Sequence, residues 1–382
     1  MTSGDSPARI NCVASYQHSP SSQYSQNEEL QESGSQPASR KLLTPTRSLR
    51  STPGTFSPIL ASLSSDKSIG RYTPASDGPS CMAVDEQEPQ PTEQEAPSQK
   101  QDSGVPRNPG FPQAQSKVEF LKKFRLSKLL LGEGSFSTVR LGLCLTTFQS
   151  VAVKIIDKSL LSKTNLLHCR TELMVLKYLS LHKHPNIVEL LDYYEDSTTL
   201  VLVFPHYDCD LYELLDNKEL TDEEIRPIFS QIVEGLRFLH KHRIAHCDIK
   251  AENVLVNVKT GRVALTDFGF ADFVFTKNSL SRFCGSVGYV APEILASRQY
   301  GCAVDIWSLG VLLFVLICRR LPFYDPDEQV EFKRMLKADY KFRSREKVSK
   351  DARSFLKLAL RPDADKRPPI EELVGHKFLR FR

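Results

Sequence analysis

The chain has 382 residues, of which 40% are hydrophobic and 25% charged, and its formal net charge is +4. This length leaves room for one large domain or two ordinary ones, and so small a positive excess argues against nucleic-acid binding. The nine cysteines are odd in number and lack metal-ligand spacing. They indicate free thiols in a reducing compartment and not a disulfide framework.

No signal sequence or membrane span is expected. The N-terminus lacks a basic segment followed by an apolar one. The longest apolar run, residues 306–318, contains Ser308 and Gly310 and is too short to cross a bilayer, so it predicts a buried helix. We expect a protein that does not bind membranes and is cytoplasmic, and the nucleus stays open as an alternative location. Residues 40–71 form a basic stretch, but it is too diluted by apolar and polar residues to predict a nuclear-import signal.

Residues 1–118 are predicted to be a disordered N-terminal tail. They are rich in Ser, Pro, Gln and Thr, and hold 10 Lys/Arg against 12 Asp/Glu, whereas the remainder has a net charge of +6. Such a segment cannot bury enough apolar surface to offset its ordering entropy. Six Ser/Thr-Pro steps are either targets of proline-directed kinases or chance products of the composition. They begin at Ser6, Ser19, Thr44, Thr52, Ser57 and Thr73.

Periodic structure is expected from about Phe120. A strand over residues 124–131 leads into a glycine-containing loop, residues 132–137, and then into a second strand over residues 138–144. Glycine lets the backbone approach a phosphate closely. A dinucleotide-binding fingerprint would pass from a strand into a helix, so the second strand favours a different kind of phosphate-binding loop.

The next predicted strand, residues 151–156, carries Lys154 inside an apolar run. A buried lysine is costly unless it is paired with an anion. Both nucleotide phosphates and the carboxylate of Glu172, on a predicted helix over residues 166–179, would serve as its partner. The alternative is that Glu172 is simply a solvated helix residue.

A capping box at residues 221–224 opens a long amphipathic helix. This helix leads into residues 246–253, with the sequence HCDIKAEN, and Asp267-Phe268-Gly269 follows. Phosphoryl transfer needs a carboxylate for the attacking hydroxyl, a cation for the migrating group and oxygen ligands for Mg²⁺. Asp248 and Lys250 are the catalytic candidates, and Asn253 and Asp267 are the metal-ligand candidates.

These motifs, in this order, resemble the eukaryotic protein kinase domain over residues 120–379. Lys250 and the run CGSVGYVAPE, residues 284–293, resemble the serine/threonine branch, most closely the calcium/calmodulin-dependent group in the broad sense. The resemblance implies an α+β fold with a small β-rich lobe and a larger helical lobe. It also implies ATP and Mg²⁺ as cofactors, and proteins with Ser/Thr acceptors as substrates. The implied nucleotide-binding residues are Gly132, Glu133, Gly134, Ser135, Phe136, Ser137, Val139, Lys154, Glu172, Tyr207 and Asp210.

By the same resemblance, Tyr207 lies in the hinge between the lobes and offers a main-chain donor to adenine. Asp210 contacts either the ribose or a basic substrate residue. Together with Glu252, it predicts a mild preference for basic residues near the acceptor. The resemblance further pairs Glu293 with Arg367 and places Asp305 as the anchor of the catalytic loop.

Two departures from the family pattern concern regulation. Cys247 stands where many kinases carry an arginine that binds an activation-loop phosphate, and Arg282 stands where the phosphorylated residue is usual. We therefore expect activity that does not rely on phosphorylation at this position. Redox control through Cys247 and Cys284 is an alternative role for these thiols, against a purely structural one. The alternative for the whole protein is a pseudokinase scaffold, although Lys154, Asp248, Asn253 and Asp267 are all retained.

Overall fold

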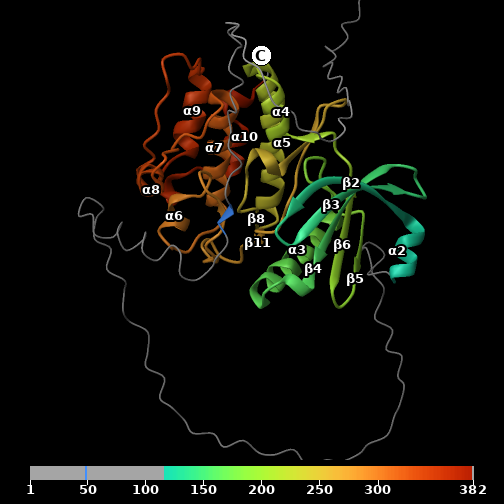
Figure 1. The fold of residues 1–382 in the computed structure, drawn as a ribbon. Helices are drawn as coiled ribbons and strands as arrows, with labels where there is room; N and C mark the ends of the chain where they lie inside the picture. The colour runs from blue at the N-terminus through green and yellow to red at the C-terminus, as the bar shows by residue number, and fades with distance from the viewer. Residues whose placement is uncertain (1–47, 50–115, 381–382) are drawn as a thin grey trace, which may run out of the picture.

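The computed structural model of the chain describes residues 48–49 and 116–380. These form two lobes (Figure 1), and the small lobe is a five-stranded antiparallel sheet, in the order β2-β3-β4-β6-β5, with α3 beside it. The elements of the small lobe are α2 (Lys117–Lys123), β2 (Phe124–Gly134), β3 (Ser137–Cys144), β4 (Ser150–Asp157), η1 (Lys158–Leu160), α3 (Lys163–His182), β5 (Asp192–Glu195) and β6 (Thr199–Pro205).

The large lobe is mainly helical and carries short strands at the face that meets the small lobe. Its helices are α4 (Leu211–Asn217), α5 (Asp222–Lys241), η2 (Ala251–Asn253), α6 (Pro292–Leu295), α7 (Ala303–Cys318), α8 (Glu328–Lys337), α9 (Lys350–Ala359), η3 (Ala364–Lys366), α10 (Ile370–Val374) and η4 (Lys377–Leu379). Its strands are β7 (Cys209–Asp210), β8 (Ile244–Ala245), β9 (Val254–Asn257), β10 (Arg262–Leu265), β11 (Asp272–Phe273) and β12 (Gly285–Ser286), and β12 pairs with β1 (Ser48–Leu49).

The two-lobed α+β fold is as expected. The glycine-containing loop is the turn of the β2–β3 hairpin, where Gly134 lies opposite Ser137, so the chain passes from strand to strand and not from strand to helix. The lobes are joined by the segment between β6 and α4, which contains the predicted hinge residue Tyr207.

The start of ordered structure was predicted too late. Helix α2 begins at Lys117, within the segment expected to be a tail, because Ser116 and Glu119 form a capping box and Phe120 is buried in the core of the small lobe. Strand β1 was not predicted at all, since a two-residue pairing with a distant segment leaves no local pattern. The rest of the predicted tail, including its six Ser/Thr-Pro steps, lies outside the described residues.

Two helices organise the core beneath the site. Helix α5 begins at the predicted capping box of Thr221 and Glu224 and buries one apolar face. Helix α7 is buried on nearly all sides from Val304 to Leu316, as its continuous apolar run predicts. At Gly310 of α7 a Cβ atom would lie 2.8 Å from the Cβ of Ala359, so glycine permits close packing against α9.

The predicted structural ion pair is present. Arg367 donates from Nη1 to Glu293 Oε1 at 2.6 Å and from Nη2 to Oε2 at 2.7 Å, and both residues are buried. The seven cysteines in the described part of the chain carry free thiols. Within the same residues, none of the helices combines the length and the apolar character needed to cross a membrane.

Candidate active site

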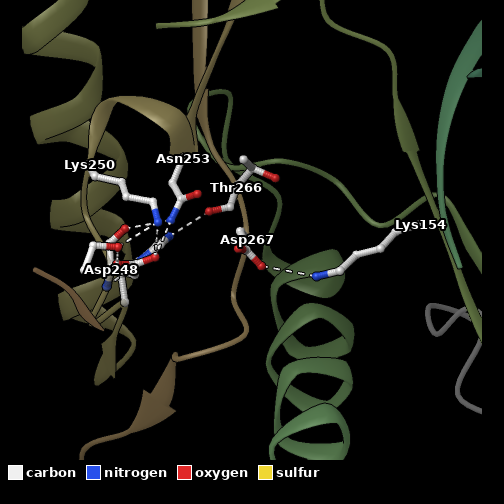
Figure 2. Close-up of polar contacts among 8 residues, drawn as sticks. Lys154, Asp248, Lys250, Asn253, Thr266 and Asp267 are labelled. Carbon is white, nitrogen blue, oxygen red and sulfur yellow. Dashed lines mark hydrogen bonds and ion pairs between the residues drawn. The ribbon is translucent and has the colours of Figure 1, made fainter. Parts of the chain in front are cut away.

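The catalytic candidates lie in the connection between β8 and β9 (Figure 2). Asp248 is buried, and its Oδ2 lies 2.9 Å from Lys250 Nζ. The side-chain amide of Asn253 donates to the Asp248 carbonyl at 2.8 Å and to its Oδ2 at 2.9 Å. The carboxylate is therefore held from two sides in one orientation, as a base for a substrate hydroxyl requires.

Asp305, on α7, holds the backbone of this loop in place, as the resemblance implied. Its fully buried carboxylate accepts the backbone N–H of His246 at 2.9 Å and that of Cys247 at 2.8 Å. Cys247 has a positive φ of 64°, which a non-glycine residue adopts only when its surroundings hold it there. The ring of His246 lies 2.9 Å from the Thr266 carbonyl, which ties the loop to the residue before Asp267. His246 therefore has a structural position, as the sequence suggested for it.

Ser286 of β12 completes the network around Asp248. Its hydroxyl donates to Asp248 Oδ1 at 2.7 Å and accepts from Lys250 Nζ at 2.7 Å, and the residue is buried. The sequence identified Ser286 only as a mark of the serine/threonine branch and not as a residue of the site. Its position in the motif was the available signal, but its contacts depend on a fold that brings β12 to the catalytic loop.

Lys154 joins the two lobes. Its ammonium lies 2.7 Å from Glu172 Oε1 on α3 and 3.2 Å from Asp267 Oδ1 in the large lobe (Figure 2 shows the second contact). The first contact is the ion pair expected from the sequence, so Glu172 is not a solvated helix residue. The second brings a predicted metal ligand next to the predicted phosphate-binding lysine.

The charges in this cluster stabilise one another. Burial alone would lower the pKa of Lys154, but the carboxylates of Asp267 and Glu172 outweigh it and raise the pKa above its usual range. In turn, Lys154 lowers the pKa of Asp267 to about 2. Asp267 is therefore an anion at neutral pH, as a metal ligand must be.

A cleft of about 560 Å³ lies between the lobes, within the size range of small-molecule sites. It is lined by most of the predicted nucleotide-binding residues and by both metal-ligand candidates. Ser135 and Phe136 are the exceptions, because Phe136 lines a smaller neighbouring cavity and Ser135 lines neither. The predicted residues that do line the cleft are Gly132, Glu133, Gly134, Ser137, Val139, Lys154, Glu172, Tyr207, Asp210, Asn253 and Asp267.

The hinge is fixed on both sides of Tyr207. The backbone N–H of His206 donates to the Ser150 carbonyl at 3.4 Å and that of Asp208 to the Val256 carbonyl at 3.2 Å. Asp210 has a local role that the sequence did not reveal, since its carboxylate caps α4 by accepting the Glu213 N–H at 2.7 Å. One oxygen of Asp210 is thus already engaged.

The cleft can provide two oxygen ligands for a magnesium ion. Asn253 uses its amide donors on Asp248, which leaves its Oδ1 as the atom able to bind a cation, and the Asp267 side chain is half exposed. The described residues contain no group of three or more His, Cys, Asp or Glu placed to hold a metal ion. Two protein oxygens with nucleotide phosphates and water match the usual coordination of Mg²⁺.

Comparison with known proteins decides the family. A model of the protein kinase domain matches residues 126–379, about two thirds of the chain. The chain belongs to the protein kinase family. The chain is 37% identical over 212 residues to the carbon catabolite-derepressing protein kinase of Saccharomyces cerevisiae. The aligned residues cover 55% of this chain and 33% of the relative.

Two further relatives carry similar names. The chain is 36% identical over 253 residues to the human SNF-related serine/threonine-protein kinase, covering 65% of this chain and 32% of the relative. It is 35% identical over 245 residues to the SNF1-like protein kinase ssp2 of Schizosaccharomyces pombe, covering 64% and 42%. The chain thus spans about a third of the length of the Saccharomyces cerevisiae and human relatives.

The guanidinium of Arg282 holds the activation segment of this kinase domain against Phe270. Arg282 Nη2 donates to the carbonyl of Phe270, just after the Asp267-Phe268-Gly269 turn, and its guanidinium lies 5.5 Å from the centre of the Phe270 ring. Tyr300 donates from its hydroxyl to the Arg282 carbonyl at 2.7 Å. The sequence singled out Arg282 but could not identify its partner, which comes from twelve residues earlier in the chain.

Cys247 and Cys284 are both buried between the catalytic loop and the activation segment. A hydrogen bond from Cys247, together with the Arg282 guanidinium, lowers the pKa of Cys284 to about 6 despite its burial. The Cys284 thiol also lies 3.3 Å from the Tyr300 hydroxyl. The two thiols therefore lie next to each other where the catalytic loop meets the activation segment.

Proposed function

We propose that this chain is a protein serine/threonine kinase that transfers the γ-phosphoryl group of ATP to Ser/Thr hydroxyls of proteins. The observation that carries the proposal is the network around Asp248, in which Lys250, Asn253 and Ser286 fix a buried carboxylate beside the cleft. The names of the relatives, which are serine/threonine-protein kinases and SNF1-like kinases, support this reaction.

In this mechanism Asp248 orients the substrate hydroxyl and accepts its proton as the oxygen attacks the γ-phosphorus. Lys250, which is bound to both Asp248 and Ser286, stabilises the negative charge of the transferring group. Most of the rate enhancement comes from positioning and electrostatic stabilisation, since little covalent chemistry is left to the protein in phosphoryl transfer.

Lys154 binds the ATP phosphates beneath the β2–β3 hairpin, and Glu172 positions it. Asn253 and Asp267 would hold Mg²⁺, and the ion would neutralise charge on the phosphates. Lys154 lies next to Asp267, so the carboxylate that would bind Mg²⁺ also contacts the lysine that binds the phosphates.

The test is phosphate transfer from ATP and Mg²⁺ to a serine-containing peptide by the full chain. Wild type should transfer phosphate and Asp248→Asn should not, while both bind nucleotide equally, because Asp248 is not part of the cleft lining. Nucleotide binding without any transfer by the wild type would overturn the proposal and favour a pseudokinase scaffold.

We further propose that activity does not depend on a phosphate at the usual place in the activation segment. Support comes from Arg282, whose contact with the Phe270 carbonyl links the segment to the Asp267 turn through side-chain and backbone atoms of the chain itself. Purified enzyme treated with phosphatase should keep its activity, and Arg282→Ala should lose more activity than Arg282→Lys. Loss of activity on dephosphorylation, recovered with phosphate on Ser279 or Ser281, would overturn this proposal.

The substrate preference that we propose is mild. Glu252, Glu213 and Asp210 all line the cleft and favour basic residues near the acceptor. The capping role of Asp210 weakens its share of this preference. Peptide arrays should show reduced transfer when basic residues near the acceptor are replaced, and unchanged transfer would overturn the preference.

A further inference from the structure

A segment of the chain far upstream of the kinase domain is paired with its activation segment. Strand β1 (Ser48–Leu49) lies antiparallel to β12 (Gly285–Ser286), with Ser48 opposite Ser286 and Leu49 opposite Gly285. In Figure 1, β1 is the short blue arrow beside the large lobe. The two strands form a sheet of their own. The edge of β12 therefore accepts an extended peptide, which is one of the recurring modes of peptide recognition.

The position of β12 gives this pairing a chemical meaning. The hydroxyl of Ser286 donates to Asp248 Oδ1 at 2.7 Å and accepts from Lys250 at 2.7 Å, so β12 lies directly beside the proposed base. A peptide that pairs with β12 is brought to the place where a substrate hydroxyl would be deprotonated. The residue that the register places opposite Ser286 is itself a serine, Ser48.

The sequence around Ser48 fits the proposed substrate class. Arg47 precedes it and Arg50 follows two residues later, and acidic side chains line the cleft. A segment on the same chain also has a higher effective concentration at the site than a free peptide. Extended backbone, a hydroxyl residue in register and flanking basic residues thus coincide at one position.

We propose that Ser48 is an intramolecular phosphorylation site, modified by the kinase domain of the same molecule. This inference rests on the proposed kinase activity. Asp248 accepts the proton of the Ser48 hydroxyl, a bond forms between Ser48 Oγ and the γ-phosphorus, the bond from that phosphorus to the β–γ bridging oxygen breaks, and ADP leaves. The product carries about −1.5 to −2 charges, and repulsion by Asp248 and Asp267 favours release of β1 from β12.

The experiment uses the full chain, first treated with phosphatase and then incubated with ATP and Mg²⁺. Mass spectrometry should find phosphate on Ser48 before the neighbouring Thr46 and Ser51, at a rate per molecule that does not change on dilution. Ser48→Ala should remove this phosphate and Ser48→Thr should retain it. Ser57→Ala, at a Ser-Pro step of the same predicted tail, is the matched control and should have no effect.

Mixing distinguishes transfer within one molecule from transfer between molecules. An Asp248→Asn chain with a tag of different mass should stay unphosphorylated at Ser48 when mixed with active enzyme. Phosphate on the inactive chain, or on Thr46 or Ser51 in place of Ser48, would overturn the inference. An unmodified Ser48 in enzyme that phosphorylates an added peptide would also overturn it and leave the proposed function intact, whereas failure of both reactions would reject the proposed function.

Discussion

Replacing Glu172 by glutamine tests the arrangement of charges around Lys154. The Lys154–Glu172 contact at 2.7 Å is buried, and the side chains are 17% and 7% exposed. A charge-assisted hydrogen bond of this kind is worth about 1.5–3 kcal/mol. Without it, Lys154 keeps only Asp267 as an anionic partner, at 3.2 Å, and competes more strongly with Mg²⁺ for that carboxylate.

We therefore expect Glu172→Gln to lower kcat/KM for ATP by roughly 10- to 150-fold and to raise the Mg²⁺ concentration needed for half-maximal activity. Steady-state kinetics with varied ATP and Mg²⁺ measures both effects. Glu195→Gln is the matched control, because Glu195 pairs with Lys158 at 3.0 Å in the same lobe without lining the cleft. Unchanged kinetics in Glu172→Gln, or an equal loss in the control, would refute the reasoning.

Three further predictions concern single side chains. Ser286→Ala should lower kcat by about tenfold or more, because it removes the hydroxyl that bridges Asp248 and Lys250, and Ser286→Thr should retain activity in the same peptide assay. Asp305→Ala should lower the free energy of unfolding by about 3–5 kcal/mol in denaturant titrations, because two buried backbone N–H groups lose their acceptor; a loss below 1 kcal/mol would contradict this. Burial raises the pKa of Glu331 from 4.5 to about 7. Since the unfolded chain ionises first as pH rises, stability should fall between these two values. In Glu331→Gln the free energy of unfolding should not fall over this pH range, and at pH 8 it should exceed that of the wild type by up to about 3 kcal/mol. A difference between variant and wild type that does not change with pH would contradict this explanation.

Much of the site was predictable because its signals are local. The capping box of Thr221, the lysine inside an apolar strand and the spacing of Asp248 and Asn253 are each contained within a few residues. The Lys154–Glu172 pair was predictable because a lysine inside an apolar strand needs an anionic partner, whereas the Glu293–Arg367 pair followed from the family resemblance.

The features that were missed depend on contacts between segments that are distant in the sequence, or on a side chain that could serve either a local structural role or ligand binding. The sequence near Ser48 contains no pattern that predicts its pairing with Ser286. Arg282 contacts a backbone carbonyl, and every residue type has one, so its partner could not be predicted. Asp210 shows the second case, since helix capping and ligand binding favour the same carboxylate. Sequence reasoning identifies the chemistry of a side chain more readily than the partner that it chooses.

The contact between Arg282 and Phe270 has a consequence for inhibitor design. A compound that binds only after residues 267–269 turn over must first separate the Arg282 guanidinium from the Phe270 carbonyl. Its apparent affinity is then reduced by the fraction of molecules in which this contact is broken, and a stronger contact makes that fraction smaller. Compounds shaped to the cleft with Lys154, Glu172 and Asp267 in contact avoid this cost, so this kinase should discriminate between the two inhibitor classes by the strength of one arginine contact.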